Sequence, residues 1–197
     1  MIDIRNVYGT LLNSREEFER WRPRMGEAPY KAAPKAPILY VKPANTWSRH
    51  GARIRVPAPV EIGATVGLVM KAPGQVGAHV LMNDFSLPHE SYFRPPVKFR
   101  CLDGFLGIGT AAEAARDAAA YSIEVRINGE LRQTVRFDAL VRDAQRLLAE
   151  VGEFMTLGAG DVLMLGLAAD RPLARAGDVV ELRCDGLGTL SNTLEGA

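Results

Sequence analysis

Histidine and cysteine are scarce in this sequence, and their scarcity excludes several kinds of metal and covalent site. The 197 residues include three histidines and two cysteines. Cys101 and Cys184 lie far apart and form neither a Cys-x-x-Cys metal pattern nor the framework of a disulfide-rich domain. We therefore expect two reduced thiols, as in proteins of the cytoplasm.

Long apolar runs are also missing. No window reaches the roughly 18 apolar residues that a membrane-spanning helix needs. The leading residues MIDIRNVYGTLLNSREEF contain no apolar core followed by a small-residue cleavage site, the pattern of a secretion signal. We therefore expect a cytoplasmic protein without a membrane partner.

An excess of one charge is lacking as well, since 24 Lys and Arg face 23 Asp and Glu. A net charge of +1 gives no reason to expect nucleic acid as a partner. Residues 1–60 hold eleven basic and five acidic residues, a net +6, so the remaining chain carries a net −5. This basic portion could attract an anionic substrate, although an ordinary solvated surface explains it as well.

With 197 residues, 47% of them hydrophobic, the chain can bury a large core without disulfide bonds or a structural metal. We expect one domain, 1–197, with the basic portion 1–60 packed on a β core. Short strand candidates recur about every 12 residues with Pro or Gly between them, which favours a mainly β (α+β) fold over βαβ units. The predicted strands are 7–12, 38–42, 52–56, 65–70, 78–82, 161–167, 179–184 and 188–193, the last two paired.

A hairpin is predicted where Ile123, Val125 and Ile127 alternate with polar residues. Asn128-Gly129 supplies the turn, and the returning strand covers 131–135. Helices are expected at 15–22 and from Asp138 to a stop before Gly158. The alanine-rich residues 111–120 indicate a weak helix or a surface connection.

Residues 82–109 form the stretch in which chemically active side chains concentrate. They read MNDFSLPHESYFRPPVKFRCLDGFLGIG, and their apolar residues keep neither the period of a strand nor that of a helix. Functional groups often lie on such loops. A surface loop with solvated charges is the alternative interpretation. Its candidate residues are Asp84, His89, Glu90, Arg94, Lys98 and Arg100.

Six motifs lie along nearly the whole chain. They are 30–35 with 42–46 (YKAAPK, KPANT), 82–86 (MNDFS), 90–95 (ESYFRP), 103–105 with 108–109 (DGF, IG), 128–130 (NGE), and 153–157 with 160–161 (EFMTL, GD). Taken in this order, they resemble the fumarylacetoacetate hydrolase superfamily. The resemblance implies a mixed β-roll, dimers or higher oligomers, and a Mg²⁺-dependent pocket for 2-oxo acids.

Within that superfamily, the chain looks like one half of the decarboxylase/isomerases of aromatic-compound catabolism, which are built from two related halves. It is most similar to the amino-terminal half or to its stand-alone subunit. The resemblance implies a small anionic 2-oxo acid as ligand. A homodimer or a complex with a paralogous subunit is the implied assembly.

The sequence departs from the family pattern at the positions of the metal ligands and of the acid/base histidine. Asp84 matches a metal-binding Asp, but the strand that should carry Glu-x-Glu reads Ile62-Gly63-Ala64. Mg²⁺ prefers several oxygen ligands. We therefore expect no tightly bound cofactor, and Mg²⁺ or Mn²⁺ only if this degenerate Asp84 site is completed otherwise. Asn13 matches the family, whereas Glu17 replaces the expected acid/base histidine.

The resemblance and the residue chemistry together suggest a role for each candidate. Decarboxylase or isomerase chemistry is expected rather than carbon–carbon hydrolysis, because the histidine of the hydrolases is missing. Arg100 aligns with the family's active-site lysine, but a guanidinium cannot release its proton as a base. The predicted catalytic residues are His89, Glu90 and Arg100, and the predicted substrate-binding residues are Arg94, Lys98, Lys42 and Asn45.

Each of these roles has a structural alternative. His89 suits a proton relay near neutral pH, or it is a solvent-exposed loop residue. Arg94 binds substrate, or it forms a salt bridge with Asp103 or Glu90. Asp84 is interpreted as a relic that caps local backbone amides. Two functions follow: an enzyme subunit, or a catalytically silent homologue that supports a metal-binding paralogous subunit.

Overall fold

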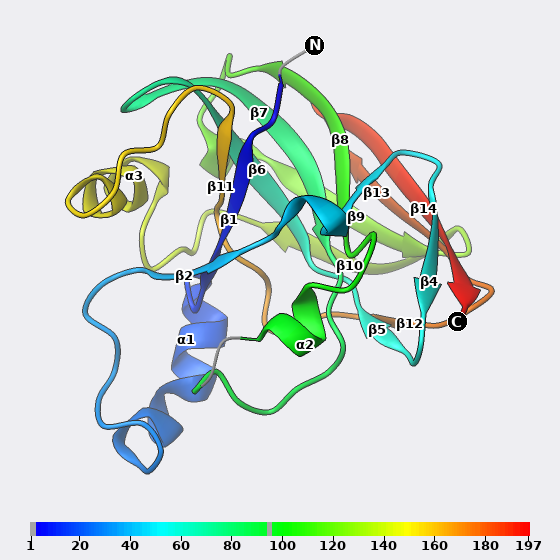
Figure 1. The fold of residues 1–197 in the computed structure, drawn as a ribbon, viewed down its shortest axis with the longest axis horizontal. Coiled ribbons are helices and arrows are strands. Elements are labelled where there is room, and N and C mark those ends of the chain that lie inside the picture. Colours follow the sequence, from blue (N-terminus) through cyan, green and yellow to red (C-terminus); the bar gives the residue numbers. More distant parts are fainter. Residues whose placement is uncertain (1–2, 94–95) are drawn as a thin grey trace.

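Two β-sheets enclose most of the core in the computed structural model, which describes residues 3–93 and 96–197 (Figure 1). The larger sheet has the strand order β2-β1-β11-β6-β7-β8-β3, and the smaller has the order β10-β9-β13-β14-β4. A two-stranded sheet joins β12 to β5. This mainly β architecture confirms the predicted fold class. No helix within the described ranges has the length and apolar character needed to cross a membrane.

The strands of the larger sheet lie far apart in the sequence. They are β1 (Asn6–Leu11), β2 (Ile38–Val41), β3 (Trp47–Arg49), β6 (Ala64–Ala72), β7 (Gln75–Asp84), β8 (Leu106–Glu113) and β11 (Asp161–Met164). The smaller sheets contain β4 (Arg53–Val56), β9 (Ser122–Ile127), β10 (Glu130–Arg136), β13 (Val179–Cys184), β14 (Gly188–Gly196), β5 (Val60–Glu61) and β12 (Leu173–Ala174).

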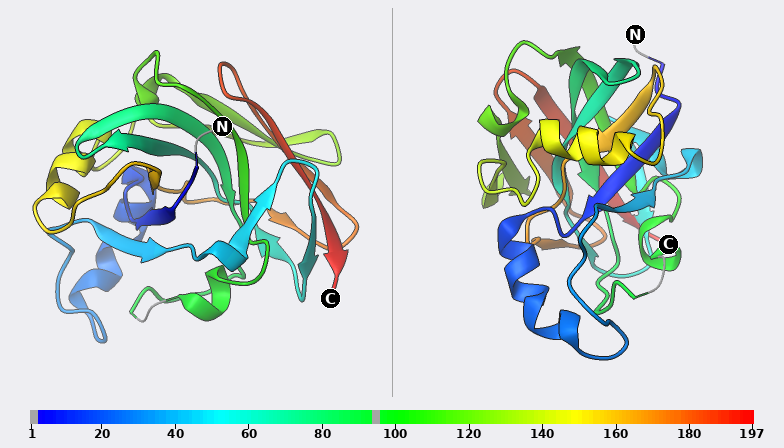
Figure 2. Two further views of the ribbon diagram at one scale, coloured as in Figure 1. Left: turned by 45° about the horizontal axis from the view of Figure 1, so that its top comes forward. Right: turned by 90° about the vertical axis from the view of Figure 1, so that its left-hand side faces the viewer.

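Within the described ranges, three short α-helices lie outside the sheets. They are α1 (Arg15–Trp21), α2 (Val97–Arg100) and α3 (Ala144–Gly152). Figures 1 and 2 show α1 and α2 at the same end of the molecule, below the strands, and α3 at one side. The loops that carry the candidate residues therefore gather at the end occupied by α1 and α2.

The larger sheet is buried on both faces at its centre. Along β6, Val66 and Leu68 pack into the core between the sheets, whereas Val69 packs into a second cluster on the opposite face. A strand covered on both sides reads as a continuous apolar run. The smaller sheet instead has one face toward solvent. Accordingly, β9 alternates between buried and at least partly exposed residues.

The structure confirms the predicted hairpin. Strands β9 and β10 are antiparallel, and Asn128 and Gly129 both have positive φ angles, of 53° and 82°. It also confirms the pairing of β13 with β14. Such local patterns depend on turn chemistry that a few adjacent residues supply.

Two predicted elements were wrong. Residues 106–113 form β8 between β7 and β3, where we expected loop up to Gly109 and then a helix or connection. The strand is built from small residues because its neighbours are close: a Cβ on Gly107 would lie 2.7 Å from the Asn192 side-chain oxygen. The second predicted helix is α3, and it begins after Asp143 rather than at Asp138. The Asp143 side chain accepts a hydrogen bond from the Arg146 N–H.

Gly9 makes room for the Tyr40 ring where β1 pairs with β2. The two residues are register partners, and a Cβ on Gly9 would lie 2.0 Å from the ring carbon Cζ. Overpacking of this kind costs about 1–3 kcal/mol. We expect Gly9→Ala to lower the free energy of unfolding in urea by that amount. Gly152→Ala is the control, since a Cβ there meets nothing within 4 Å. Equal midpoints for both variants would contradict this placement of Tyr40.

Candidate functional site

Four buried polar side chains meet at the end of β7. Asp84 ends that strand, Tyr40 comes from β2, Lys42 follows β2, and Arg100 ends α2. We call them the Asp84 cluster. Asp84 Oδ2 accepts hydrogen bonds from the Tyr40 hydroxyl and from Arg100 Nη1, the latter at 2.8 Å. Lys42 Nζ lies 2.8 Å from Asp84 Oδ1, an ion pair whose angles are poor for a hydrogen bond.

Lys42 is held inside a cage of oxygen atoms. Besides its ion pair with Asp84, its ammonium donates to the backbone carbonyls of Arg100 and Phe105, the second at 2.8 Å. An ammonium has three N–H donors, and the two carbonyls take two of them, while the carboxylate adds an ion pair. Because its side chain is also 0% exposed, Lys42 holds the loops around β7 in place from inside.

Burial and charge act in opposite directions on the pKa values of this cluster. Burial alone would raise the pKa of Asp84, but Lys42 and Arg100 outweigh it and hold that pKa below its usual value. Burial lowers the pKa of Lys42, and the Asp84 charge partly offsets this. The Tyr40 pKa is raised well above its usual value, by burial and then by Asp84. Asp84 is therefore ionised, and Tyr40 is a neutral donor.

A second buried ion network lies beside the first. Arg171 contacts Glu17 Oε1 at 3.0 Å and Glu61 Oε2 at 2.7 Å, and the Tyr92 hydroxyl donates to Glu17 at 2.9 Å. We call these four residues the Arg171 network. They come from α1, from β5, from the loop after β7 and from the segment before β12. Burial and the Glu17 charge raise the pKa of Tyr92 to about 12.

His89 is half-buried between the two groups. Its ring stacks on Phe99 with 5.0 Å between centroids and meets the Tyr92 ring edge-on at 5.6 Å. Nδ1 lies 2.9 Å from the Leu87 carbonyl oxygen, and Nε2 is buried without a partner. Burial lowers the pKa of His89, and the nearby Arg100 charge lowers it further. The imidazole is therefore neutral at pH 7.

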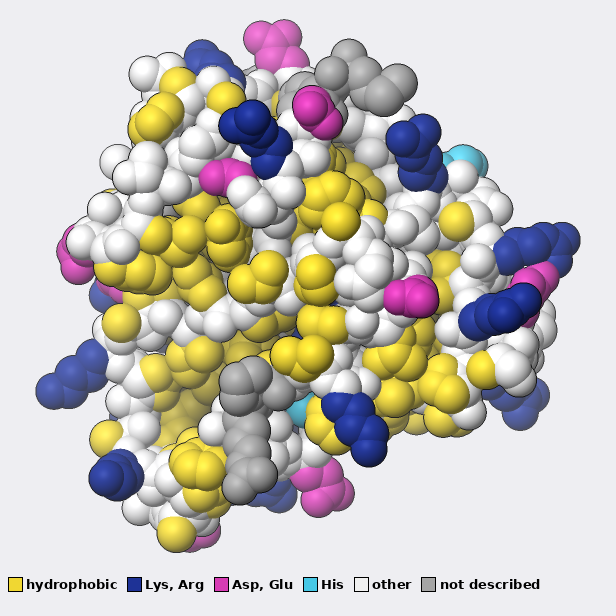
Figure 3. Space-filling model, viewed as in Figure 1, with side chains coloured by type: hydrophobic (Ala, Val, Ile, Leu, Met, Phe, Trp, Pro, Cys, Tyr) yellow, Lys and Arg dark blue, Asp and Glu magenta, His cyan; other side chains and the backbone are white. Residues whose placement is uncertain are grey.

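An apolar cavity of about 560 Å³ leads to the Asp84 cluster. Strand β2 forms one wall, and Tyr92, Phe93 and Val97 belong to the other. Phe93 and Val97 are 52% and 61% exposed, whereas Arg100, which also lines the cavity, is 0% exposed and lies at its inner end. Figure 3 shows hydrophobic side chains gathered on this face.

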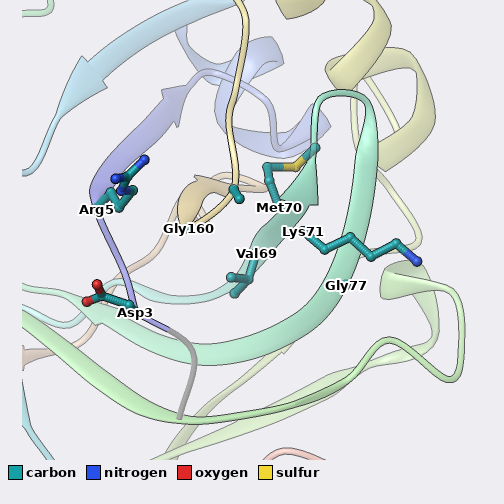
Figure 4. A pocket seen from close by; sticks show the side chains of 8 residues that line it. Asp3, Arg5, Val69, Met70, Lys71, Gly77 and Gly160 are labelled. Atoms are coloured by element: carbon teal, nitrogen blue, oxygen red, sulfur yellow. The ribbon is translucent and has the colours of Figure 1, made fainter.

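A second cavity, of about 450 Å³, lies between the residues that precede β1, the end of β6 and the residues that precede β11. Asp3, Arg5, Lys71 and Gly160 are among its lining residues. Figure 4 shows that the side chains of Asp3, Arg5 and Lys71 point in different directions. Because they share no common point, they form no binding constellation, and the candidate site is the first cavity.

The structure brings together some of the predicted site residues and separates others. Lys42, Asp84 and Arg100 are in contact, and His89 is near enough for the Arg100 charge to lower its pKa. Asn45 is exposed and donates to the Cys101 carbonyl and the Asp103 carboxylate. Glu90 and Lys98 are exposed and make no hydrogen bond or ion pair within the described residues. Arg94 lies outside those residues. All these roles remain predictions.

One expectation is corrected by this geometry. The Asp84 carboxylate binds two cations and a phenol, so it does not cap local backbone amides. Of the two cations predicted on residues 97–100, Lys98 is exposed, whereas Arg100 is buried. Sequence reasoning missed Tyr40, Tyr92 and Arg171 as site residues, since none of them has a distinctive local pattern.

The side chains present do not fit a divalent metal ion. The Asp84 oxygens are already engaged, and Ile62 and Ala64 are buried in the apolar core. Among the described residues, no group of three or more His, Cys, Asp and Glu side chains is placed to hold a metal. Mg²⁺ needs nearly octahedral oxygen ligands, which this donor set does not offer.

Asp84→Asn tests whether the buried carboxylate holds the cluster together. Without it, two buried cations have no counter-charge, and breaking a buried pair costs about 3–5 kcal/mol. We expect this loss in the free energy of unfolding in urea. Glu195→Gln is the control, because its pair with Arg53 is exposed and contributes about 1 kcal/mol or less. If Asp84→Asn lowers the free energy of unfolding no more than Glu195→Gln does, the Asp84 cluster does not stabilise the structure around the end of β7.

Comparison with known proteins places this chain in a family. Residues 6–195 match the model described as fumarylacetoacetate (FAA) hydrolase C-terminal. A 4-hydroxyphenylacetate degradation bifunctional isomerase/decarboxylase of Salmonella dublin is 34% identical over 198 residues. That alignment covers 94% of this chain but only 46% of the relative, so the chain spans about half the length of that protein.

Solved structures show the same fold. A 5-carboxymethyl-2-hydroxymuconate delta-isomerase from Mycobacterium smegmatis superposes with a TM-score of 0.82 at 23% identity, covering 100% of this chain and 80% of its own. A fumarylpyruvate hydrolase from Pseudomonas aeruginosa, in complex with Mn²⁺ and pyruvate, gives 0.81 at 16% identity, with coverages of 100% and 91%. On the match over residues 6–195, the chain belongs to the fumarylacetoacetate (FAA) hydrolase C-terminal family.

Proposed function

We propose that this chain is a unit of a decarboxylase/isomerase that acts on unsaturated 2-oxo di- or tricarboxylates in aromatic-compound catabolism, and that it works without a metal of its own. The observation that carries this proposal is the state of Arg100. Its Nη1 binds Asp84, while Nε and Nη2 are buried without a hydrogen-bond partner beside an apolar cavity.

Unpaired buried donors favour an anionic ligand. Leaving a buried polar group without a partner costs about 1–3 kcal/mol, and a carboxylate can accept from two guanidinium N–H groups at once. The Asp84 cluster holds two cations and one anion, and the Arg171 network beside it holds one cation and two anions. The apolar walls suit the carbon chain of an unsaturated acid.

The same guanidinium suits the chemistry of the relatives. Loss of CO₂ from a β-keto acid leaves an enolate, and a fixed cation stabilises its developing charge in a site that excludes water. Arg100 keeps its proton throughout, so its role is electrostatic. The isomerase step also needs a group that moves a proton, and this role falls to His89.

A supporting subunit is the second candidate function. It is favoured by Ile62 and Ala64, which occupy the positions of the family's Glu pair, and by the engaged Asp84 oxygens. The Salmonella dublin relative is about twice as long as this chain. This length supports a partner for the chain, which is either a second copy or a paralogous chain. In that case this chain would contribute an interface, and the partner would contribute the metal.

Activity measurements separate these two functions. Arg100→Lys keeps a positive charge for Asp84 but removes the guanidinium fork. We expect kcat/KM to fall about 30- to 150-fold, which corresponds to about 2–3 kcal/mol of charged hydrogen bonding. The kcat/KM of Arg94→Ala should fall by a similar factor if Arg94 also binds the substrate. Arg53→Lys, on the exposed surface, is the control.

The assay follows CO₂ release and, separately, the absorbance of the conjugated dienol, first with the chain alone and then with a metal-binding paralogue. Turnover by the chain alone that depends on Arg100 supports the enzyme. Turnover only in the mixture, with Arg100→Lys harmless, makes this chain a supporting subunit.

Titration calorimetry tests the absence of a metal of its own. We expect no micromolar binding of Mg²⁺ or Mn²⁺ by the single chain, because Asp84 is already neutralised by Lys42 and Arg100. Treatment with a chelator should then leave the unfolding midpoint unchanged. Micromolar binding would show that the metal ligands lie elsewhere in the chain.

A further inference from the structure

The cavity beside β2 and α2 has one charged side chain among its described lining residues. That side chain is Arg100, which is 0% exposed. Two contacts hold its guanidinium: Nη1 donates to Asp84 at 2.8 Å, and Cζ lies 5.0 Å from the centroid of the Tyr40 ring. Nε and Nη2 have no hydrogen-bond partner within the described residues. The cavity therefore has one pair of donors, already oriented, for an anion.

Nε and Nη2 belong to the same edge of the guanidinium. Because the group is planar, their N–H bonds are nearly parallel and match the two oxygens of one carboxylate. Such a ligand would give both nitrogens a partner, which buried polar groups seldom lack in native proteins. A phosphate or sulfate would bring further charged oxygens, and the described lining residues include no second cation for them. The donor pair therefore favours a single carboxylate.

The other polar side chains among the described lining residues already have partners. The Tyr40 and Tyr92 hydroxyls each donate to a buried carboxylate. The Cys101 thiol donates to the Val41 carbonyl at 3.5 Å. A second carboxylate inside the cavity would lose its hydration without meeting a cation or an unoccupied side-chain donor of these residues. The cavity therefore disfavours a ligand that carries two charges within it.

The remaining walls suit a hydrocarbon chain. Val41 on β2, Phe93 and Val97 on α2 are large apolar side chains that are exposed to solvent and line this cavity. Leu11 and Ile38 extend the apolar lining. Removing apolar surface from water is the main favourable term in binding of this kind. An apolar segment attached to the carboxylate would cover these side chains.

We propose that this cavity binds an amphipathic carboxylic acid, with its carboxylate on Arg100 and an apolar segment along Val41, Phe93 and Val97, and that it rejects acids with a second charge in that segment. This inference deepens the proposed function, on which it rests for the carboxylate at Arg100. A substrate with several carboxylates then has only one of them inside the cavity, and the others lie beyond Phe93 and Val97. These two rim residues thereby determine specificity.

Simple acids test the two halves of this specificity. In NMR titrations of the whole chain with butanoate, hexanoate and octanoate, Kd should fall about fourfold for each added methylene, the usual gain from burying a CH₂ group. Hexanedioate has the length of hexanoate but a second carboxylate. It should bind at least about 30-fold more weakly, because that group loses water without gaining a partner.

Alkylation of Cys101 locates the bound acid. This partly exposed thiol lines the cavity, whereas Cys184 is buried in the core and serves as the internal reference. At ten times its Kd, octanoate should slow the labelling of Cys101 by iodoacetamide about tenfold by mass action, as measured by peptide mass spectrometry. Arg100→Lys, which lacks the guanidinium fork, should lose this protection at the same concentration. An unchanged labelling rate at saturating octanoate would place the acid elsewhere and overturn the inference.

Val97→Lys tests the role of the rim. Because Val97 is exposed, the substitution is compatible with folding, and it places an ammonium where the second carboxylate would lie. Hexanedioate should then bind about two- to fivefold more tightly, as expected for an exposed ion pair, and octanoate more weakly. Val179→Lys is the matched control, since Val179 is also an exposed valine but belongs to β13 and is not among the lining residues.

The outcomes separate this inference from the proposed function. Protection of Cys101 by octanoate and rejection of hexanedioate, in a chain that shows no turnover alone or with a paralogue, would support the inference and overturn the proposed activity. Turnover that depends on Arg100, with hexanedioate bound as tightly as hexanoate, would overturn the inference while the proposed function stands. Equal responses of Val97→Lys and Val179→Lys would also overturn it, because the rim would then not select the ligand.

Discussion

Burial of the Asp84 charge is the constraint on which the rest of this site depends. A carboxylate removed from water is costly unless cations and donors replace its hydration. Here Lys42 and Arg100 supply two positive charges, and Tyr40 supplies a hydroxyl. Meeting these demands draws β2, the end of β7 and α2 to one point. The cavity and its exposed apolar rim are consequences of that arrangement.

The two cations around Asp84 differ from a metal ion as a source of positive charge. A metal ion is a mobile charge that several carboxylates share. Lys42 and Arg100 are instead attached to the backbone, so their positions are determined by folding. One guanidinium nitrogen of Arg100 faces the protein's own carboxylate, and Nε and Nη2 have no hydrogen-bond partner within the described residues.

How much of the fold could be predicted from the sequence depended on how local each pattern was. The hairpin around Asn128-Gly129 was predictable because two residues encode its turn. Strand β8 was not, since its glycines and alanines make room for neighbours such as Asn192, and that need is invisible along the chain. The helix start at Asp143 was missed because Asp138 is also an acceptable N-cap residue.

The candidate site was predictable in the same uneven way. Lys42, Asp84, His89 and Arg100 were singled out from motif resemblance and from the chemistry of one loop, and their roles stay predictions. Their mutual contacts were not, because residue types do not reveal which side chains will be buried together. Arg171 gave no signal at all. Its importance comes from two glutamates distant in sequence, which only the folded chain brings together.

The Arg171 network has a consequence for the order of folding. Its contacts join residues separated by 75, 110 and 154 positions. Long loops must close before any of these contacts forms, so they contribute little to an early nucleus. Interactions formed after the transition state act mainly on the unfolding rate. The Arg171 network therefore slows the unfolding of the site more than it speeds its folding.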